Sequence, residues 1–384
     1  MAARISLAIL LLAGRAAAEP AEPSDAQILG SDPGWRVEDV QLRTSYIHQR
    51  GHGYQSQDGP QAGPGSEAMT IIEPFALITL RQSATVVHEI TIPVDVITAA
   101  SPDAVDATTS ASRRNEAVDL DVRSTFKQSD TDTLTTRLMA HYEEPLSSGA
   151  IGAGWRHSLA DDNAAIAISG NLSIDGFDNH DQFGNYLGKT LRDTVNLNAS
   201  ASQLLSPTTV LDGGYGGTLE HGTLTNGWNA VPILGLHPAG DFVPHDRARH
   251  AISARLAQHV PQTHSTIKLW YRFYADSWGI VGHTIEVDAY QYVLPWLYVR
   301  AGYRYHHQTA ADFFTTGLVP PVASDTLRTS DSDLARLSAH EWSVQVSTVH
   351  ARGRAWSLSG EVMRYTRSND LAITAVALTV GRLL

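Results

Sequence analysis

Charged side chains recur at alternate positions along several stretches of this chain, most clearly between residues 263 and 307. Alternate residues of a β-strand point to the same face of a sheet, so these charges would form one polar face. Two roles are open for them. They can form ion pairs that hold neighbouring strands in register, or they can line an opening and select ions or small solutes by charge. The candidates for a charged, lumen-facing surface are Glu89, Asp95, Asp119, Asp121, Arg123, Lys127, Lys268, Arg272, Glu286, Asp288, Arg300 and Arg304.

Three arginines of this set have acidic residues between them. Arg272 lies on one expected strand and Arg300 and Arg304 on another, with Glu286 and Asp288 on the strand that separates them. Because neighbouring strands lie ~4.8 Å apart, we expect these charges to alternate as positive, negative and positive across the sheet. If this face is solvated, replacing Arg300 by leucine should be tolerated for membrane insertion, with little loss of stability.

The seventeen histidines show no spacing typical of a metal site or of a catalytic dyad. His306 and His307 are adjacent, so on a strand they point to opposite faces and cannot share an ion. The adjacent pair His157 and Ser158 is excluded as base and nucleophile for the same reason, and no Gly-x-Ser-x-Gly motif occurs. We therefore predict no catalytic, metal or cofactor site, and a protein that is not an enzyme.

The strands that must position the charges are indicated by apolar residues at the intervening positions. Ile267, Leu269 and Tyr271 alternate with the charges of the first stretch. No stretch with a helical period of 3.6 competes with this pattern. The expected strands are 37–48, 69–80, 84–97, 115–127, 131–143, 151–160, 164–177, 189–203, 208–219, 249–260, 263–275, 281–293, 296–307, 339–350, 355–367 and 370–384.

The lengths of the connections favour a membrane barrel over a soluble sandwich. Even-numbered connections are all short, whereas several odd-numbered ones are long and rich in Gly, Pro, Ser and Asp. This asymmetry is typical of outer-membrane barrels, which have short periplasmic turns and long extracellular loops. We predict an all-β, transmembrane antiparallel β-barrel of about sixteen strands, with fourteen as the alternative. The short connections are 81–83, 128–130, 161–163, 204–207, 261–262, 294–295 and 351–354, and the long ones are 49–68, 98–114, 220–247 and 308–338.

Residues 1–18 have the features of a secretory signal peptide. A positive residue precedes the apolar segment 5–13, and three alanines ending at Ala18 provide a cleavage site. This segment is too short to cross a bilayer as a helix, and no later window reaches about eighteen consecutive apolar residues. Residues 19–34 are expected to form a flexible periplasmic lead, and residues 35–384 the barrel.

Composition agrees with export to the outer membrane. The chain has no cysteine, which excludes disulfides and suits a protein that crosses the periplasm unfolded. Its formal net charge of -12 argues against a nucleic-acid partner. We expect a location in the outer membrane of a Gram-negative bacterium, with membrane lipid and the barrel-insertion machinery as partners. The apolar alternation of Val376, Leu378 and Val380 is typical of the final strand that this machinery reads, although Arg382 interrupts it.

Most tryptophans fall near the ends of expected strands, where amphipathic rings settle at lipid headgroups. We interpret them as a membrane-interface girdle. The tryptophans assigned to it are Trp270, Trp278, Trp296, Trp342 and Trp356.

The middle of the chain also carries motifs with a specific spacing. In the run 271–286, Tyr-Arg-Phe-Tyr is followed by Asp276, Trp278 and Gly279, and Arg-Ala-Arg-His precedes it at 247–250. These motifs resemble a family of bacterial outer-membrane barrels, the domain of unknown function 3570. The resemblance implies the same barrel fold. The family has no settled activity, and the genes beside its members imply at most a link to exported redox proteins.

Two functions are consistent with this fold. The first is a porin-like pore or channel for ions or small solutes. The second is a plugged barrel that serves as a structural or partner-binding scaffold at the cell surface, with exported redox proteins as its implied associates. The loop 308–338 is long enough to fold inward as a constriction or to stand outward as a binding surface, and the sequence leaves that choice, the selectivity and the oligomeric state open.

Overall fold

The computed structural model describes residues 34–51, 68–99, 114–143, 146–180, 185–225, 230–348 and 355–384. The expected signal peptide and nearly all of the expected lead lie outside these residues. Among the residues described, no helix is long and apolar enough to cross a membrane.

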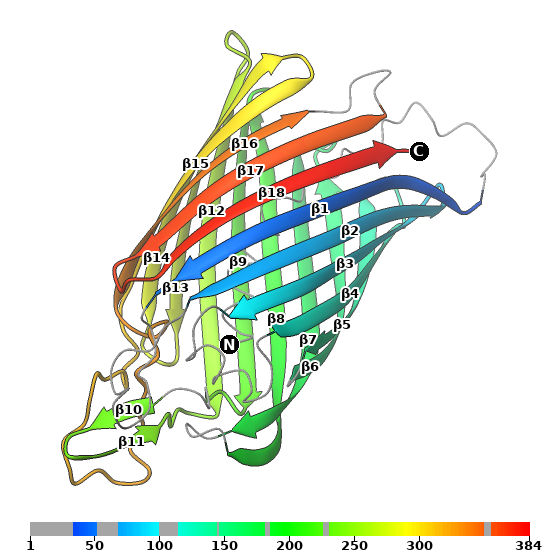
Figure 1. Cartoon of the computed structure of the whole chain (residues 1–384). Helices are drawn as coiled ribbons and strands as arrows, with labels where there is room; N and C mark the ends of the chain where they lie inside the picture. Colours follow the sequence, from blue (N-terminus) through cyan, green and yellow to red (C-terminus); the bar gives the residue numbers. More distant parts are fainter. Residues whose placement is uncertain are drawn as a thin grey trace.

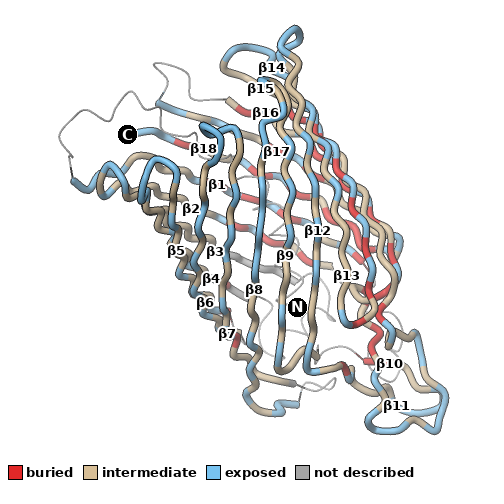
Figure 2. The backbone as a smooth tube through the Cα atoms, turned by 180° about the vertical axis from the view of Figure 1, so that it is seen from behind, coloured by how far each residue is buried: buried red, intermediate tan, exposed pale blue. Residues whose placement is uncertain are grey.

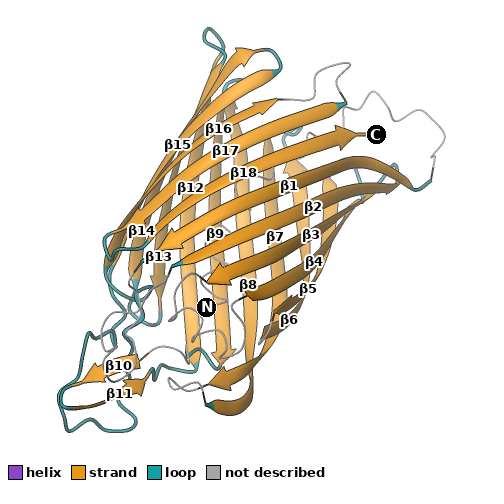
Figure 3. Ribbon diagram, viewed as in Figure 1, coloured by secondary structure: helices purple, strands orange, loops and turns teal. Residues whose placement is uncertain are grey.

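Sixteen antiparallel strands form one closed barrel, and two further strands form a separate hairpin (Figures 1 and 3). Each barrel strand pairs with the next barrel strand along the chain, with β9 pairing to β12 past the separate hairpin, and β1 pairs with β18 to close the ring. The barrel strands are β1 (Arg36–Arg50), β2 (Met69–Ser83), β3 (Val86–Ala99), β4 (Arg114–Lys127), β5 (Asp132–Glu143), β6 (Leu146–Leu159), β7 (Ala164–His180), β8 (Tyr186–Ser206), β9 (Thr209–Gly222), β12 (Asp246–Val260), β13 (Ser265–Asp276), β14 (Val281–Leu294), β15 (Leu297–Gln308), β16 (Leu337–Thr348), β17 (Trp356–Arg367) and β18 (Ala372–Leu383). The prediction of sixteen strands is therefore confirmed, and the alternative of fourteen is wrong.

The outer face of the barrel is apolar, as the alternation predicts. Leu138, Ile151 and Ile168 keep 59%, 60% and 57% of their surface exposed, although in a water-soluble domain such side chains would fill the core. On β18, Leu378 is 59% exposed, while its neighbour Ala377 is 5% exposed on the inner face. An apolar exterior with a polar interior is the arrangement that lipid requires of a spanning barrel.

Short turns and long connections are sorted to opposite rims. The turn between β6 and β7 is tight, with positive φ angles of 54° at Asp161 and 65° at Asp162, a conformation that short polar side chains tolerate. The connection between β15 and β16, by contrast, spans residues 309–336. Figure 1 shows this connection, with the hairpin of β10 (Ala230–Ile233) and β11 (Leu236–Gly240), beyond the rim opposite the short turns. The predicted asymmetry of the loops is confirmed.

Burial on the inner face is uneven around the barrel (Figure 2). From β14 through β18 to β2 many inward side chains are buried, including an apolar cluster around Ile47, Ile71 and Met363. From β4 to β9 and on β12 and β13, inward side chains are mostly intermediate in exposure. The accessible part of the inner wall is therefore on the side of β4 to β13.

Candidate functional site

The structure places the charged candidates of β13, β14 and β15 on the less exposed face of the barrel wall. Lys268 on β13 is opposite Asp288 on β14, and Glu286 on β14 is opposite Arg304 on β15. The outward neighbours Ile285 and Val287 are 46% and 39% exposed, whereas Glu286 is 9% exposed and Asp288 8%. These charges therefore point inward.

Two arginines of β15 form ion pairs across the wall. Arg304 binds Glu286 of β14, with Nη2 2.7 Å from Oε2, and lies 3.7 Å from Glu341 of β16 on its other side. Arg300 instead binds Glu361 of β17 at 2.5 Å, reaching over the intervening strand β16. The expected alternation is present for Arg304. For Arg300 the ion pair is instead with Glu361 on β17.

The surroundings of Arg300 also differ from the expectation of a wet surface. Its side chain is 3% exposed and that of Glu361 6%. Removing one member of a buried ion pair leaves the other charge uncompensated, at a cost of about 3–5 kcal/mol. Replacement of Arg300 by leucine is therefore expected to be costly, because the pair is enclosed by neighbouring side chains.

Two cations of β13 have aromatic neighbours and no carboxylate partner among the residues described. The Lys268 ammonium lies 4.9 Å from the ring centre of Tyr290, and the Arg272 guanidinium lies 5.8 Å from that of Tyr274. Trp270 lies between these cations on the same inward face, with the Arg304 guanidinium 5.8 Å from its ring centre. We call Lys268, Trp270, Arg272 and Tyr274 the basic stripe.

The position of Trp270 corrects one sequence interpretation. Trp270 faces the interior, and Trp278 is buried in a loop at 4% exposure, so neither belongs to a girdle at the membrane interface. Trp342 and Trp356 are each 58% exposed on the outer face. Trp356 also carries Arg382 over its ring at 5.1 Å, which explains how that cation is tolerated on the apolar face of β18.

The part of the wall from β4 to β12 carries a second series of ion pairs. Asp119 lies 2.7 Å from His141, and Asp121 accepts a hydrogen bond from Nε of Arg137 at 2.8 Å. Both aspartates were predicted, but their partners were not, although all lie at polar positions of expected strands. The same wall holds the pairs Asp175–Arg192 and Asp212–Arg255, each with an Nε–oxygen distance of 2.8 Å.

The remaining predicted candidates are less connected. Glu89 on β3 is directly opposite Arg123 on β4, but no ion pair joins them in the described structure. Lys127 binds Asp130 at 3.2 Å in the short turn after β4. The side chain of Asp95 lies outside the described residues.

The arginines in these two parts of the barrel wall differ in how much of their side chains is exposed to solvent. The side chains of Arg137, Arg192 and Arg255 keep 43%, 26% and 39% of their surface exposed. Those of Arg300 and Arg304 keep 3% and 17%. The pairs of β4 to β12 are therefore open to solvent in the lumen, whereas those of β14 to β17 form part of the packed wall.

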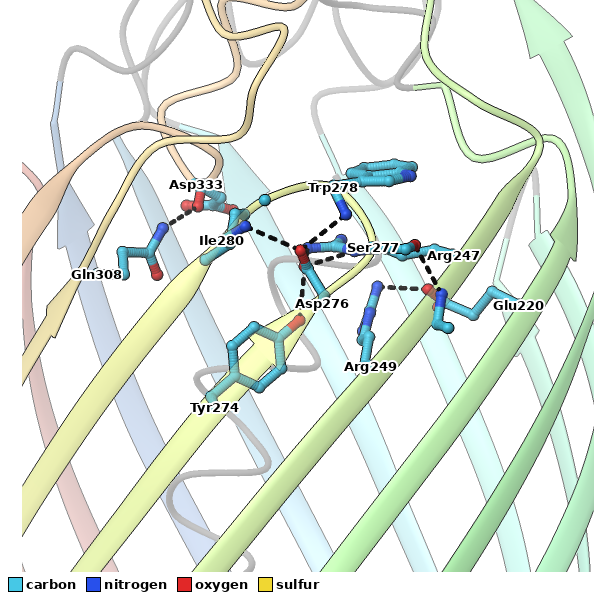
Figure 4. Close-up of polar contacts among 12 residues, drawn as sticks. Glu220, Arg247, Arg249, Tyr274, Asp276, Ser277, Trp278, Ile280, Gln308 and Asp333 are labelled. Atoms are coloured by element: carbon cyan, nitrogen blue, oxygen red, sulfur yellow. Dashed lines mark hydrogen bonds and ion pairs between the residues drawn. The ribbon is translucent and has the colours of Figure 1, made fainter.

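A polar hub at the loop rim joins β12, β13 and β14 (Figure 4). Asp276, the last residue of β13, has a fully buried side chain. Its Oδ1 accepts hydrogen bonds from the backbone N–H groups of Trp278 and Ile280, both at 3.0 Å. Its Oδ2 accepts from the Tyr274 hydroxyl at 2.8 Å and from Nε of Arg247 at 3.0 Å. One carboxylate therefore accepts hydrogen bonds both from the backbone of the turn and from a side chain of the neighbouring strand β12.

Arg247 is held by a second contact. Its guanidinium lies 4.2 Å from the ring centre of Trp278, and the Trp278 indole N–H donates to the Asp246 carbonyl at 3.0 Å. Next to it, Arg249 binds Glu220 of β9 at 2.6 Å. Four of the motif residues, Arg247, Tyr274, Asp276 and Trp278, therefore form one connected structure, whose role was not apparent from the sequence.

The long loops fold together into what we call the loop lobe, residues 230–243 and 309–336. The backbones of Phe242 and Arg328 exchange hydrogen bonds of 2.9 and 2.8 Å, and Ser330 Oγ donates to the Ala230 carbonyl at 2.8 Å. Through Val243 and Ala311 the lobe shares an apolar core with Trp278 and Ile280 of the β13–β14 connection. The partly buried residues packed around this core are Leu224, Tyr274, Phe313, Phe314 and Leu334.

The loop lobe is also fixed to the loop-side end of β17. Arg367 at the end of β17 binds Asp333 at 2.5 Å and donates to the Ser332 carbonyl at 3.0 Å. The hub and this pair together hold the lobe in place, and it stands outward from the barrel end (Figure 1). Of the two alternatives left open for residues 308–338, the outward arrangement is the one observed.

The described residues contain no group of three or more histidine, aspartate or glutamate side chains that could hold a metal ion. His306 and His307 point to opposite faces: His306 bonds to Thr284 inside at 2.9 Å, and His307 to Ser338 outside at 3.1 Å.

Comparison with solved structures finds distant barrels. The chain is similar to a structure described as a bacterial polysaccharide outer membrane secretin, with 6% sequence identity and a TM-score of 0.49, over 90% of this chain and 98% of that one. It is similar to a BenF-like porin from Pseudomonas fluorescens Pf-5, with 10% identity and a TM-score of 0.46, over 92% and 100%. It is also similar to OccK1 (OpdK) of Pseudomonas aeruginosa, with 10% identity and a TM-score of 0.43, over 91% of this chain and 98% of that one. These similarities concern the fold alone.

No curated protein matches the sequence. The model of one family does: the family described as "Protein of unknown function (DUF3570)" matches residues 160–378, which is more than half of the chain. The matched region includes the Arg247–Asp276 hub, the basic stripe and the loop lobe. The chain therefore belongs to the DUF3570 family.

Proposed function

We propose that this protein is a porin-like barrel in the outer membrane of a Gram-negative bacterium, where it forms a water-filled pore for ions or small solutes. The observation that carries the proposal is a closed ring of sixteen strands with an apolar exterior and a charged interior. A barrel of this size encloses more space than its own inward side chains fill.

The accessible inner wall supports a route for solutes on the side of β4 to β13. There the ion pairs stay partly exposed, and the two cations of the basic stripe, Lys268 and Arg272, have no carboxylate partner among the described residues. Cations in a narrow aqueous passage attract anions and repel cations. The stripe therefore gives the pore a local preference for anions.

Ion selectivity tests this function. The wild-type protein and the double variant Lys268→Glu/Arg272→Glu are each inserted into planar bilayers, and the reversal potential is measured across a salt gradient. We expect the variant to shift towards cation selectivity, because two positive charges become negative. The charge-conserving variant Lys268→Arg/Arg272→Lys serves as the control and should match the wild type. Channels with identical selectivity in all three proteins would contradict a route along this wall.

The loop lobe favours a second candidate function, binding of a partner at the cell surface. Three apolar side chains at its tip, Leu234, Leu236 and Val319, are 71%, 62% and 72% exposed. They lie on a lobe that packs on an apolar core at the rim, and exposed apolar patches often mark protein-binding sites. The link to exported redox proteins that the family resemblance implies belongs to this candidate.

The partner-binding function is tested by replacing these three residues with serine. Cross-linking on intact cells should yield a discrete adduct with the wild type and not with the variant, while pore conductance stays the same. An equal cross-linking pattern in both proteins would refute the lobe as a binding surface.

A further inference from the structure

Three tyrosine–histidine pairs of nearly identical geometry lie on the outer surface of the barrel. In each pair the tyrosine hydroxyl is hydrogen-bonded to Nδ1 of the histidine, at 2.8, 2.8 and 2.9 Å. The ring centres are 6.1, 6.2 and 6.2 Å apart, and the rings are inclined by 28°, 31° and 30°. The pairs are Tyr215–His250, Tyr271–His283 and Tyr303–His340.

Each pair occupies the same place in its hairpin. The tyrosine lies on a strand that runs towards the loop rim, and the histidine lies on the returning strand, for β9 and β12, β13 and β14, and β15 and β16. All three histidines are exposed, and Tyr215 and Tyr271 are 43% and 41% exposed. They belong to the outward set that includes Leu269 and Ile285, so they face the membrane.

The pairs are displaced regularly along the strands. Tyr215 is directly opposite Ile252, which is opposite Phe273. Tyr271 lies two residues from Phe273, towards the rim with the short turns. A step of two strands, ~9.6 Å across the sheet, therefore shifts the pair ~6.8 Å along the strand, a slope of about 35°.

The next pair repeats this displacement. Tyr271 is opposite Ile285, which is opposite Tyr305, and Tyr303 again lies two residues nearer the short-turn rim. Strands in membrane barrels tilt by about 35–45°, so a shift of this size cancels the tilt and keeps the pairs at one height. The three pairs therefore form a level belt around β9 to β16.

On β14 the belt lies near the long-loop end of the apolar band, with Val281 as the one outward residue of the strand beyond His283. On β14 the outward residues between His283 and Gln291 are Ile285, Val287 and Ala289. Eight residues span ~27 Å along the strand, or roughly 20 Å in height at this tilt, which approaches the ~25 Å of a barrel's apolar band. The histidines are therefore at the depth of the lipid headgroups, on the side of the long loops.

Every pair has one hydrogen-bond donor to spare. A tyrosine and a neutral histidine together carry two donors, one O–H and one N–H. Only one of them is used between the two rings, whichever histidine tautomer is present. The other can bind an acceptor from the surroundings.

A guanidinium extends the belt. Arg364 on β17 is directly opposite Trp342 and donates to the Thr374 hydroxyl at 2.5 Å on the outer face. It has no carboxylate partner among the described residues, and the outward positions of β13 to β18 within the described ranges hold no aspartate or glutamate. A cation at a lipid interface without a protein anion is complementary to an anionic headgroup.

We propose that this belt binds the phosphate groups of lipids in the leaflet on the long-loop side. The proposal rests on the proposed membrane location of the barrel. Spare donors of the three pairs and the Arg364 guanidinium supply hydrogen bonds and charge at headgroup depth. Phosphate oxygens are the matching acceptors, so recognition is of the headgroup and not of the acyl chains.

Lipid retention on the purified barrel tests the proposal. The protein is taken from mixed vesicles of phosphatidylcholine, phosphatidic acid and diacylglycerol with the same acyl chains, and the lipids that stay bound are measured by native mass spectrometry. The main variant is Tyr215→Phe/His250→Phe/Tyr271→Phe/His283→Phe/Tyr303→Phe/His340→Phe/Arg364→Gln, because either partner of a pair left alone would still carry a free donor. Since the spare donors of three pairs and one guanidinium charge are lost, we expect retention of phosphatidic acid to fall about tenfold or more. Retention of diacylglycerol should not change.

Controls separate this result from a folding defect. The variant Tyr215→Phe/Tyr271→Phe/Tyr303→Phe leaves one free histidine N–H in each pair and keeps Arg364, so it should retain phosphatidic acid nearly like the wild type. His259→Phe removes a histidine bonded to Thr266 at 3.1 Å near the opposite rim, and should retain lipid like the wild type. Gel mobility before and after heating reports on the barrel of each variant. If the main variant folds and keeps its phosphatidic acid, or loses both lipids equally, the proposal is overturned, whereas a wild type found in the soluble periplasm would refute the proposed membrane function itself.

Discussion

Replacement of Asp276 by alanine is expected to release the loop lobe while leaving the barrel closed. The carboxylate accepts from two backbone N–H groups of the turn, from the Tyr274 hydroxyl and from Arg247. Its side chain is fully buried and that of Arg247 is 10% exposed, so water does not readily replace the lost contacts. Trp278, held by this turn, is part of the core on which the lobe packs.

The size of the effect follows from these contacts. Removing one partner of a buried ion pair costs about 3–5 kcal/mol, because the remaining charge stays buried. Since 1.36 kcal/mol corresponds to a factor of ten, the equilibrium for opening the lobe should rise by about two to four orders of magnitude. The change is local, because the strand ladders do not depend on this carboxylate.

Hydrogen exchange of individual amides measures the opening. The amides of Ala311 and Leu334 are hydrogen-bonded within the lobe, to the carbonyls of Leu334 and Asp331 at 2.8 and 2.9 Å. In Asp276→Ala they should exchange faster by about the factor above, and strand amides should keep the wild-type rate. The control Asp325→Ala removes an exposed aspartate from the same lobe and should have no effect. Unchanged exchange of the lobe amides in Asp276→Ala would refute the role assigned to the hub.

Three further predictions concern the wall, the orientation and the turn. Arg300→Leu should lower the melting temperature of the barrel strongly, and the added change Glu361→Leu should recover much of the loss, because the double variant leaves no unpaired buried charge; equal melting of the single variant and the wild type would contradict a buried pair. Cysteine at position 325 should react with an impermeant maleimide on intact cells and cysteine at 162 should not; the reverse result would invert the barrel. Gly279→Ala should loosen the loop lobe as well, since φ is +85° and an added Cβ would collide with a neighbouring carboxylate, and wild-type exchange rates in the lobe would count against this strain.

Most of the barrel was predictable because its signal is local. Each strand displays its two faces through alternation, so one stretch such as 263–275 reveals a strand without knowledge of its partner. Strand ends were less certain: β6 begins at Leu146, earlier than the predicted residue 151, because its first residues are small and polar and show no alternation. The hairpin of β10 and β11 was missed because strands of four and five residues are too short for a periodic pattern.

For the candidate site, the sequence predicted which charged side chains point into the barrel but not which of them form ion pairs with one another. Alternation orients Arg300 and Arg304 alike, yet the partner of Arg300 depends on how a long side chain crosses β16. The Asp276 hub combines a turn, a neighbouring strand and a buried carboxylate, and only the folded chain brings these together. Burial was the other missing quantity: period-two spacing distinguishes inside from outside but does not separate the packed wall at β14 to β17 from the accessible wall at β4 to β13.

The most direct test of the pore is the conductance of the purified, refolded wild-type protein in a planar bilayer. A closed barrel with a water-filled interior predicts discrete current steps of uniform size, seen only with protein that shows the folded, heat-modifiable band. Folded protein that inserts into the bilayer and leaves the current at background would contradict the pore, and would leave the barrel as a surface scaffold.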